Sequence, residues 1–465
     1  MIEYIDVYCT VRGTKSDGKP MDLDDATNLG GLIARDATYG TFGEFTGDYW
    51  DDKILASARQ LASVDLIKNL SNPGEFGFRL RIASDLFKPT SGGIQHLIGI
   101  LAGDLGILQV RGLTLSLIRV TDVEFPDAWK ESMKAKYRSG AHSIEGIRRS
   151  FALDENKPLL AFSLKPRIGL TFDALEEITL GVLAAGFHLV ELDTRNLDLE
   201  QNTVDLLTGL SQKAAEVGKQ NRITRFSINL SASAEVAIPI CASLIEKVPA
   251  PMVVKIDGGL DGITTIQAIR SAFNSQNGKE TPVITTYPLL RNVIGQRIAD
   301  DTFLNALVLS GSDIIYPGGA PNLGGYRQLD HSIQGALANS VDRYLNMCSS
   351  GFPMPTVAGG IYPGQLQAYY ELLGPDVAYF LGGGVALHKS GPVAGASLCV
   401  RILREARKLR ERAGRAEFAA EISGRLLEEA EGAIEVPAGA DENTFRYIPV
   451  QELKSIAGLK PWFKR

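Results

Sequence analysis

The chain has 465 residues, of which 45% are hydrophobic and 22% charged; this composition is typical of globular proteins and excludes collagen, coiled coil and wholesale disorder. Its formal net charge of −6 offers no overall positive field, so neither nucleic acid nor anionic lipid is expected as a principal partner. The four cysteines form no CxxC pair, which argues against a disulfide framework or a thiolate zinc site and favours a reducing cytoplasm. Neither a signal peptide nor a membrane-spanning stretch is recognised, so no membrane is expected as a partner.

Residues 1–140 mix strand-like and helix-like segments in no repeating order, which predicts a separate N-terminal α+β domain. Strands are expected over Ile2–Arg12 and Gly77–Ile82. Helical spacing over Asp22–Ala37 predicts a helix that leads into a turn rich in glycine and threonine.

Residues 141–465 follow a different pattern, in which eight short apolar runs alternate with amphipathic helical windows. This alternation predicts an α/β fold, a (β/α)₈ TIM barrel with C-terminal helices, as the second domain. The active site of this fold lies where the strands end at their carboxyl termini. The eight runs are Leu159–Lys165, His188–Asp193, Thr224–Leu230, Met252–Ile256, Val283–Tyr287, Asp313–Tyr316, Thr356–Ile361 and Val377–Gly382.

The chain from about Ala394 onward is predicted to be helical, with arginines interleaved among glutamates such as Glu405 and Glu411. Such a pattern is typical of a solvated helix with salt bridges along its surface. The alternative is an interaction surface.

Two glycine groups lie at the carboxyl ends of the seventh and eighth runs, Gly359-Gly360 and Gly382-Gly383-Gly384. Barrel enzymes often bind phosphate at these two loops, where backbone N–H groups approach the anion because no side chain intervenes. The alternative is that the glycines only make tight turns. The presence of both groups favours a phosphate site.

Charged residues end the first two runs. Lys165 and Arg167 are two residues apart and share one face of a strand, where two cations in a barrel mouth would need an anion. Glu191 and Asp193 share a face in the same way, and paired carboxylates suit Mg²⁺. The alternatives are a solvent-facing pair of cations, and a metal-free ionic network of the carboxylates with Lys165, Arg167 or Arg195.

Together these motifs resemble the large chain of ribulose-bisphosphate carboxylase (RuBisCO), and most closely the form IV RuBisCO-like proteins, which do not fix CO₂. The resemblance extends from about Ile33 to about Ala406. Residues 165–170 resemble the family's Lys-Pro-Lys-Leu-Gly-Leu motif, whose first lysine transfers a proton, and residues 40–42 resemble its Gly-Thr-Trp segment. The resemblance implies proton transfer by Lys165 and phosphate binding by Gly359, Gly360, Gly383, Gly384 and, from a second subunit, Thr41.

Departures from the family pattern define the expected metal site. Counted without gaps from Arg167, the family's carbamylated lysine falls at Glu191, and its next two metal ligands fall at Asp193 and Thr194. A permanent carboxylate therefore replaces the carbamate, and one of the two other carboxylates is lost. The resemblance implies an Mg²⁺ site that needs no activation by CO₂.

Other departures bear on the substrate. Residues 316–325 contain no lysine where the carboxylases carry the one that polarises CO₂, so no CO₂ fixation is expected. Tyr287 and Tyr316 occupy the positions of two family histidines, and Arg291 could replace the arginine that grips a second phosphate. Asp104 falls at the position of a metal-side asparagine, contributed across the dimer, with a helix-capping aspartate as the alternative. Because the arginine that grips a second phosphate has no adjacent counterpart, we expect a substrate with one phosphate, held by the glycine loops.

The resulting hypothesis is a lyase or isomerase that forms and reprotonates a metal-stabilised enediolate on a mono-phosphorylated sugar derivative, in a homodimer with shared active sites. The loss of the carbamate and the extra arginines Arg167, Arg195 and Arg291 favour an acidic substrate, and hence a decarboxylase or transcarboxylase of a 3-oxo sugar-acid phosphate of the 3-oxo-isoapionate 4-phosphate type. One alternative is an isomerase or enolase of a methylthio-pentulose or diketo phosphate in methionine salvage. Another is a metal-free, non-catalytic binding protein.

Overall fold

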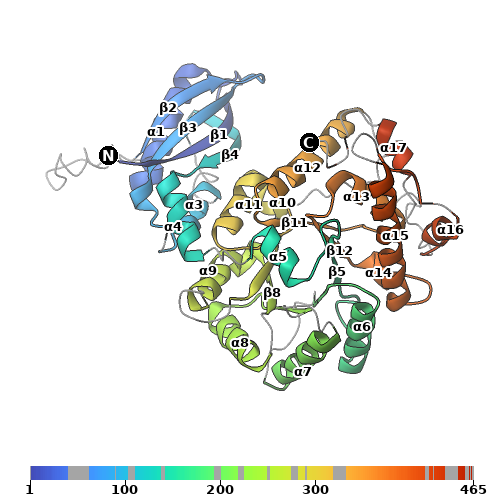
Figure 1. The fold of residues 1–465 in the computed structure, drawn as a ribbon. Helices are drawn as coiled ribbons and strands as arrows, with labels where there is room; N and C mark the ends of the chain where they lie inside the picture. Colours follow the sequence, from blue (N-terminus) through green and yellow to red (C-terminus); the bar gives the residue numbers. More distant parts are fainter. Residues whose placement is uncertain are drawn as a thin grey trace. The chain divides into compact units, whose positions relative to one another are not determined.

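The computed structural model divides the chain into two compact units, one made of Met1–Arg138 with Leu289–Ser310 and the other of Ser139–Pro288 with Gly311–Arg465. Figure 1 shows the elements of both, coloured along the chain. The structure describes residues 2–39, 62–89, 91–102, 110, 112–137, 142–192, 201–217, 225–248, 252–273, 281–288, 291–317, 331–413, 418–422, 424–434, 449–455, 460 and 462.

The first unit contains a four-stranded antiparallel sheet with strand order β2-β3-β1-β4. Alternate residues of β1, among them Ile5, Val7 and Val11, are buried, as expected for a strand with one face on a core. The expected α+β character is confirmed, although β2 and β4 had not been predicted. Its elements are β1 (Tyr4–Lys15), α1 (Leu23–Tyr39), β2 (Ala62–Asn69), β3 (Glu75–Ala83), η1 (Ser84–Leu86), α3 (Gly93–Ala102), β4 (Leu113–Glu124), α4 (Asp127–Tyr137), α10 (Arg291–Ile294) and α11 (Asp300–Leu309).

The second unit is a closed barrel of eight parallel strands that follow one another in chain order, as the eight apolar runs predicted. Figure 1 shows the helices arranged around the strands. The strands are β5 (Leu159–Ser163), β6 (Leu189–Glu191), β7 (Phe226–Asn229), β8 (Val253–Asp257), β9 (Val283–Tyr287), β10 (Ile314–Ile315), β11 (Met354–Ala358) and β12 (Ala378–Leu381).

Helices fill the connections of the barrel and the C-terminal region. They are α5 (Ile144–Ser150), α6 (Phe172–Ala184), α7 (Gln201–Val217), α8 (Ala234–Lys247), η4 (Gly258–Gly262), α9 (Ile263–Ala272), α12 (His331–Ser349), η7 (Pro363–Gln365), α13 (Leu366–Leu373), α14 (Gly383–Ala386), α15 (Pro392–Ala413), α16 (Arg425–Glu431) and α17 (Val450–Ser455). No helix in the described part of the chain is long and apolar enough to cross a membrane.

An apolar cluster closes the end of the barrel where the strands begin. Ile144 and Ile147 of α5 and the following Phe151 pack against the first residues of the strands, such as Leu159 and Leu189. This end is therefore filled with hydrophobic side chains, and polar chemistry is left to the opposite end, where the strands finish.

The charge pattern of the long C-terminal helix α15 predicted that its charged side chains are solvated, and one of them is buried instead. Arg401 pairs with Glu429, and Lys408 with Glu405, on partly exposed faces. Arg410, however, is only 7% exposed and its Nη1 lies 2.7 Å from Oε2 of Glu371, which is fully buried. The expectation was wrong for Arg410, because a cation was needed to compensate a carboxylate inside the fold.

Candidate active site

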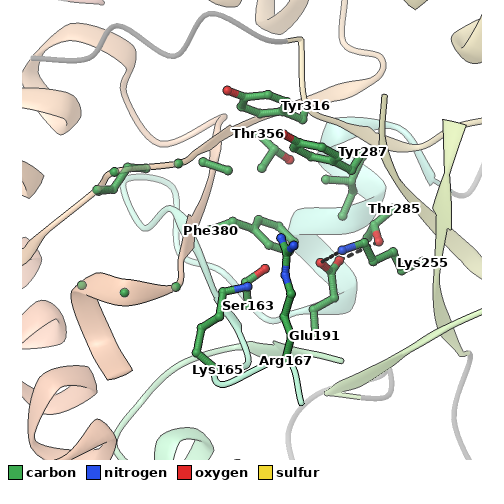
Figure 2. Close-up of a pocket in the computed structure, with 18 of the residues that line it drawn as sticks. Ser163, Lys165, Arg167, Glu191, Lys255, Thr285, Tyr287, Tyr316, Thr356 and Phe380 are labelled. Atoms are coloured by element: carbon green, nitrogen blue, oxygen red, sulfur yellow. Dashed lines mark hydrogen bonds and ion pairs between the residues drawn. The ribbon is translucent and has the colours of Figure 1, made fainter. Parts of the chain in front are cut away.

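A cavity of about 250 Å³ lies among the carboxyl ends of the barrel strands. In Figure 2, Lys165, Arg167 and Glu191 enter it from one side, and Tyr287 and Tyr316 lie on the other. All of the described lining residues belong to the barrel unit: Ser163, Lys165, Arg167, Glu191, Lys255, Thr285, Thr286, Tyr287, Ile314, Tyr316, Thr356, Ala358–Tyr362, Phe380 and Gly382–Gly384.

An ion pair between Glu191 and Lys255 occupies the inner wall of the cavity (Figure 2). The Lys255 Nζ lies 3.2 Å from Oε1 of Glu191, and both residues are only 4% exposed. The second carboxylate oxygen, Oε2, accepts a hydrogen bond of 2.9 Å from the Thr285 hydroxyl. Each oxygen of this buried carboxylate therefore already has a partner, as a charged group inside a protein requires.

Strand register explains why these three side chains meet. Lys255 of β8 is aligned with Thr285 of β9, and Glu191 belongs to β6, which is separated from β8 by β7. In a closed barrel, alternate residues of each strand point inward, so side chains from non-adjacent strands converge near the axis. The pair therefore depends on closure of the barrel.

Lys165 lies against the glycine loop that follows β12. A Cβ atom on Gly382 would stand 3.3 Å from Cε of Lys165, which is closer than most real contacts of a Cβ. The lysine is thus packed on the loop that was predicted to bind phosphate. Arg167 also lines the cavity, so the cavity receives two cations from the segment that follows β5.

The two glycine loops approach each other closely. Gly359 and Gly360, which follow β11, have φ angles of +85° and +68°, a conformation that side chains disfavour. A Cβ atom on Gly384 would overlap the carbonyl oxygen of Ile361, so only glycine allows the loop after β12 to reach the loop after β11. Among the described residues, no loop or turn hydrogen bond is donated by the amides of Gly359, Gly360, Gly383 or Gly384. Close glycine loops at this end of a barrel are typical phosphate-binding elements, and phosphate binding at these two stays a prediction.

Two tyrosines form an aromatic pair at the mouth. The rings of Tyr287 and Tyr316 are stacked with centroids 5.1 Å apart and planes inclined by 16°, and Tyr287 is 40% exposed. Tyr316 also reaches toward Gly359, because its hydroxyl would lie 4.0 Å from a Cβ on that glycine. The pair offers a flat apolar surface next to one glycine loop.

The predicted site residues divide into two groups. The structure gathers nine of them around one cavity: Lys165, Arg167, Glu191, Tyr287, Tyr316, Gly359–Gly360 and Gly383–Gly384 belong to its lining. Arg291 lies in α10 of the other unit, and its side chain is not among those described. Four further predicted residues, Thr41, Asp104, Asp193 and Thr194, lie outside the described residues.

Sequence reasoning missed several lining residues, above all Lys255. The sequence alone could have indicated Lys255, because it is a single cation between a valine and an isoleucine in the apolar run at 252–256. A charged residue inside a buried parallel strand needs a partner and marks a candidate site. Tyr362 was also missed; its hydroxyl would lie 3.7 Å from a Cβ on Gly383, and burial raises the pKa of this phenol.

The described residues do not fit an Mg²⁺ site around Glu191. Both of its carboxylate oxygens are engaged, one of them by the ammonium of Lys255, whose positive charge would repel a divalent cation. In the described part of the chain, no group of three His, Cys, Asp or Glu residues could hold a metal ion. The expected ligands Asp193 and Thr194 lie outside that part, so their share in the expected metal site stays a prediction.

Cations outnumber anions among the described residues that line the cavity. Among its described lining residues, Lys165, Arg167 and Lys255 are cationic and Glu191 is anionic. Glu191 and Lys255 form an ion pair with each other. The described lining residues thus carry three positive charges and one negative charge, a composition compatible with an anionic ligand.

Comparison with known proteins finds relatives that align with most of the chain, although no family model matches it. It is 22% identical to ribulose bisphosphate carboxylase of Archaeoglobus fulgidus, covering 84% of this chain and 87% of the relative. It is 24% identical to 2,3-diketo-5-methylthiopentyl-1-phosphate enolase of Geobacillus kaustophilus, covering 69% and 74%.

Two solved structures are similar in fold. The octameric RuBisCO of Pyrococcus horikoshii gives a TM-score of 0.68 at 19% identity and covers 88% of this chain and 90% of that one. A RuBisCO-like protein of Alicyclobacillus acidocaldarius gives 0.65 at 20% identity and covers 88% and 95%.

Proposed function

We propose that this chain, a RuBisCO-like protein of the ribulose-bisphosphate carboxylase superfamily, is an enzyme that forms an enolate on a substrate bearing one phosphate and then returns a proton to carbon. The observation that carries the proposal is the placement of Lys165 and Arg167 beside two close glycine loops, in a cavity whose carboxylate Glu191 is already compensated. No CO₂ fixation is included, because residues 316–325 contain no lysine.

Phosphate binding is assigned to the two glycine loops. The backbone at Gly359 and Gly360 is left-handed, and Gly384 lacks the side chain that would push the loops apart. Amide donors from both loops can then point at one anion, which is the usual device for binding phosphate in a barrel. Lys165, packed on Gly382, carries the nearby positive charge.

The preferred reaction is decarboxylation of a 3-oxo sugar-acid phosphate, of the 3-oxo-isoapionate 4-phosphate type. The bond from the carboxylate carbon to C2 breaks, CO₂ leaves, and the electron pair forms the C2–C3 double bond of an enolate. Lys165 then gives a proton to C2 and regains one from water. Arg167 binds the acid group, since a guanidinium pairs well with a carboxylate. A transcarboxylase would pass the carboxyl group to an acceptor instead.

A second candidate is an enolase or isomerase of a methylthio-pentulose or diketo phosphate. It is favoured by the similarity to the Geobacillus enolase and by the stacked pair of Tyr287 and Tyr316, which could contact an apolar methylthio group. In this case Lys165 would remove and return a proton next to a ketone.

A homodimer with shared sites is part of the proposal, with Thr41 and Asp104 contributed by a second subunit. It is supported by the octameric state named for the Pyrococcus protein and by the resemblance of residues 40–42 to a family segment. A cytoplasmic location is proposed from the sequence pattern of the cysteines. Mg²⁺ is left out of the mechanism, because the described residues around Glu191 do not fit it.

The test is NMR in D₂O with two substrates in parallel, 3-oxo-isoapionate 4-phosphate and a methylthio-substituted diketo phosphate. Release of CO₂ from the first, with deuterium at the carbon that lost it, supports decarboxylation. Deuterium exchange or enolisation of the second alone supports the alternative. Lys165→Met should abolish either reaction, whereas Lys213→Met on the surface of α7 should not. No reaction with either substrate would favour a non-catalytic binding protein.

A further inference from the structure

The inner wall of the cavity holds a cation that belongs to the chain itself. The ammonium of Lys255 lies 3.2 Å from Oε1 of Glu191, and both side chains are almost completely removed from solvent. Both residues nevertheless line the cavity, so a bound substrate would meet them directly.

Glu191 is held by two neighbours in a fixed arrangement. Thr285 donates its hydroxyl to Oε2, and the same hydroxyl lies 3.4 Å from the carbonyl oxygen of Val254, next to Lys255 in β8. The carboxylate therefore sits between an ammonium and a hydroxyl, both supplied by strands of the barrel. A carboxylate in such a place normally binds its cation tightly, since an uncompensated charge is expensive to bury.

A divalent cation at the same carboxylate would compete with this arrangement. It would have to displace Lys255 from Oε1 or lie close to a like charge, and displacement would leave the ammonium buried without Glu191. The positive charge that enolate chemistry requires is already present on the cavity wall without any added ion.

We propose that the Lys255 ammonium, held by Glu191, takes the place of a divalent cation in this site, so that the reaction needs no metal ion at Glu191. Lys255 is then a catalytic residue that faces the enolate oxygen of the substrate, and Glu191 and Thr285 are positioning residues. The part that concerns the enolate rests on the proposed function, whereas the exclusion of the metal ion does not.

The chemical step balances in atoms and electrons when Lys255 supplies the positive charge. During loss of CO₂ the electron pair of the broken bond moves into the new double bond and the ketone oxygen becomes an oxyanion. Lys255 stabilises that oxygen through its charge and neither gives nor takes a proton, while Lys165 supplies the proton at carbon.

Binding of Mn²⁺, followed by electron paramagnetic resonance on metal-stripped protein, tests the exclusion without any substrate. We expect identical isotherms for the wild type and Glu191→Gln. Lys255→Met should bind Mn²⁺ about tenfold more tightly or better, and the double variant Lys255→Met/Glu191→Gln should lose that gain. If Lys255→Met does not fold, Lys255→Gln, which keeps a donor for Glu191 but no charge, replaces it.

A Mn²⁺ site in the wild type that disappears in Glu191→Gln would overturn the proposal. So would the absence of any gain in the folded Lys255 variant, since removal of the ammonium should open the carboxylate to the ion. Neither result would bear on the phosphate loops or on Lys165, so the proposed function could survive both.

Turnover measures the catalytic role of Lys255. Metal-stripped wild type in the presence of a chelator should keep its full rate, and Lys255→Met should lose about 100-fold or more in kcat, the scale for losing one oxyanion partner. Thr285→Val, which leaves the ion pair in place, should lose much less. Loss of activity with the chelator and its recovery with Mg²⁺ would contradict the proposal; no turnover with any substrate would count against the proposed function instead.

Discussion

Lys165 is packed directly on Gly382. A methyl group on this glycine would stand 3.3 Å from Cε of the lysine and 3.6 Å from the carbonyl oxygen of Ser163. The proposed proton donor is thus positioned by the first glycine of the proposed phosphate loop. In the proposed function, this one contact links phosphate binding to proton transfer.

Gly382→Ala should consequently impair proton transfer more than phosphate binding. The added Cβ must push the lysine by a few tenths of an ångström. A misplacement of about 1 Å can cost about 100-fold in rate, so a smaller loss is expected here. We expect kcat to fall by about tenfold and the affinity for inorganic phosphate to stay within about twofold, measured by steady-state kinetics and calorimetry. Gly209→Ala in α7, where a Cβ meets nothing within 4 Å, is the control. Equal kcat values for Gly382→Ala and Gly209→Ala would disprove the link.

Gly384→Ala should separate the two glycine loops. The new Cβ would overlap the carbonyl oxygen of Ile361 and approach Cα of Tyr362 to 3.0 Å, so one backbone segment has to move. Affinity for inorganic phosphate, measured by isothermal calorimetry, should fall by about tenfold or more. Thermal unfolding of the same variant shows whether the barrel is intact. Unchanged phosphate binding in a folded variant would mean that phosphate does not bind between these loops.

Asp313 forms a buried charged cluster at the start of β10, far in sequence from its partners. Arg270 is paired with it, and Nδ1 of His142 lies 3.1 Å from its Oδ2. Burial acts to raise the pKa of Asp313, but the charge of Arg270, the interaction with His142 and the hydrogen bond from the Ile284 amide outweigh it and hold the pKa below the usual value. Arg270→Met would remove the cation that compensates the buried Asp313 carboxylate. We expect this change to lower the free energy of unfolding by about 3–5 kcal/mol.

Urea titration measures that loss. The double variant Arg270→Met/Asp313→Asn, which removes both charges but keeps an acceptor for the amide of Ile284, should lose less than Arg270→Met alone. Additive losses of the two single changes would show that the pair is not coupled.

His188 should make stability depend on pH. Its Nδ1 accepts the amide of Leu160, and burial, with the charges of Lys157 and Arg225, lowers its pKa to about 3. The ring is therefore neutral in the folded protein and takes a proton in the unfolded chain below its ordinary pKa of about 6.5, so stability is complete above that value and falls as the pH drops toward 3. The slope reaches about 1.4 kcal/mol per pH unit.

His188→Gln, which can still accept the Leu160 amide but does not titrate, should lose less stability than the wild type between pH 7 and pH 5. The comparison requires unfolding curves of both proteins at each pH. Parallel pH profiles would show that His188 does not carry this dependence.

The sequence was sufficient to predict the barrel and the rim of its site, and insufficient for the inner wall. All eight strands were predicted, because buried parallel strands are short apolar runs. Lys165, Arg167 and the glycine loops were predicted to line the site because each lies at or directly after the carboxyl end of such a run. The pairing of Glu191 with Lys255 was not, because β6 and β8 are not neighbours and only barrel closure brings their inward side chains together.

The most direct test of the central claim is deuterium incorporation from D₂O into a phosphorylated 3-oxo acid, followed by proton NMR for the wild type and Lys165→Met. The account predicts that the wild type releases CO₂ and places one deuterium at the carbon that lost it, whereas Lys165→Met does neither at a measurable rate while still binding inorganic phosphate. Equal rates of release and labelling in the two proteins would contradict it.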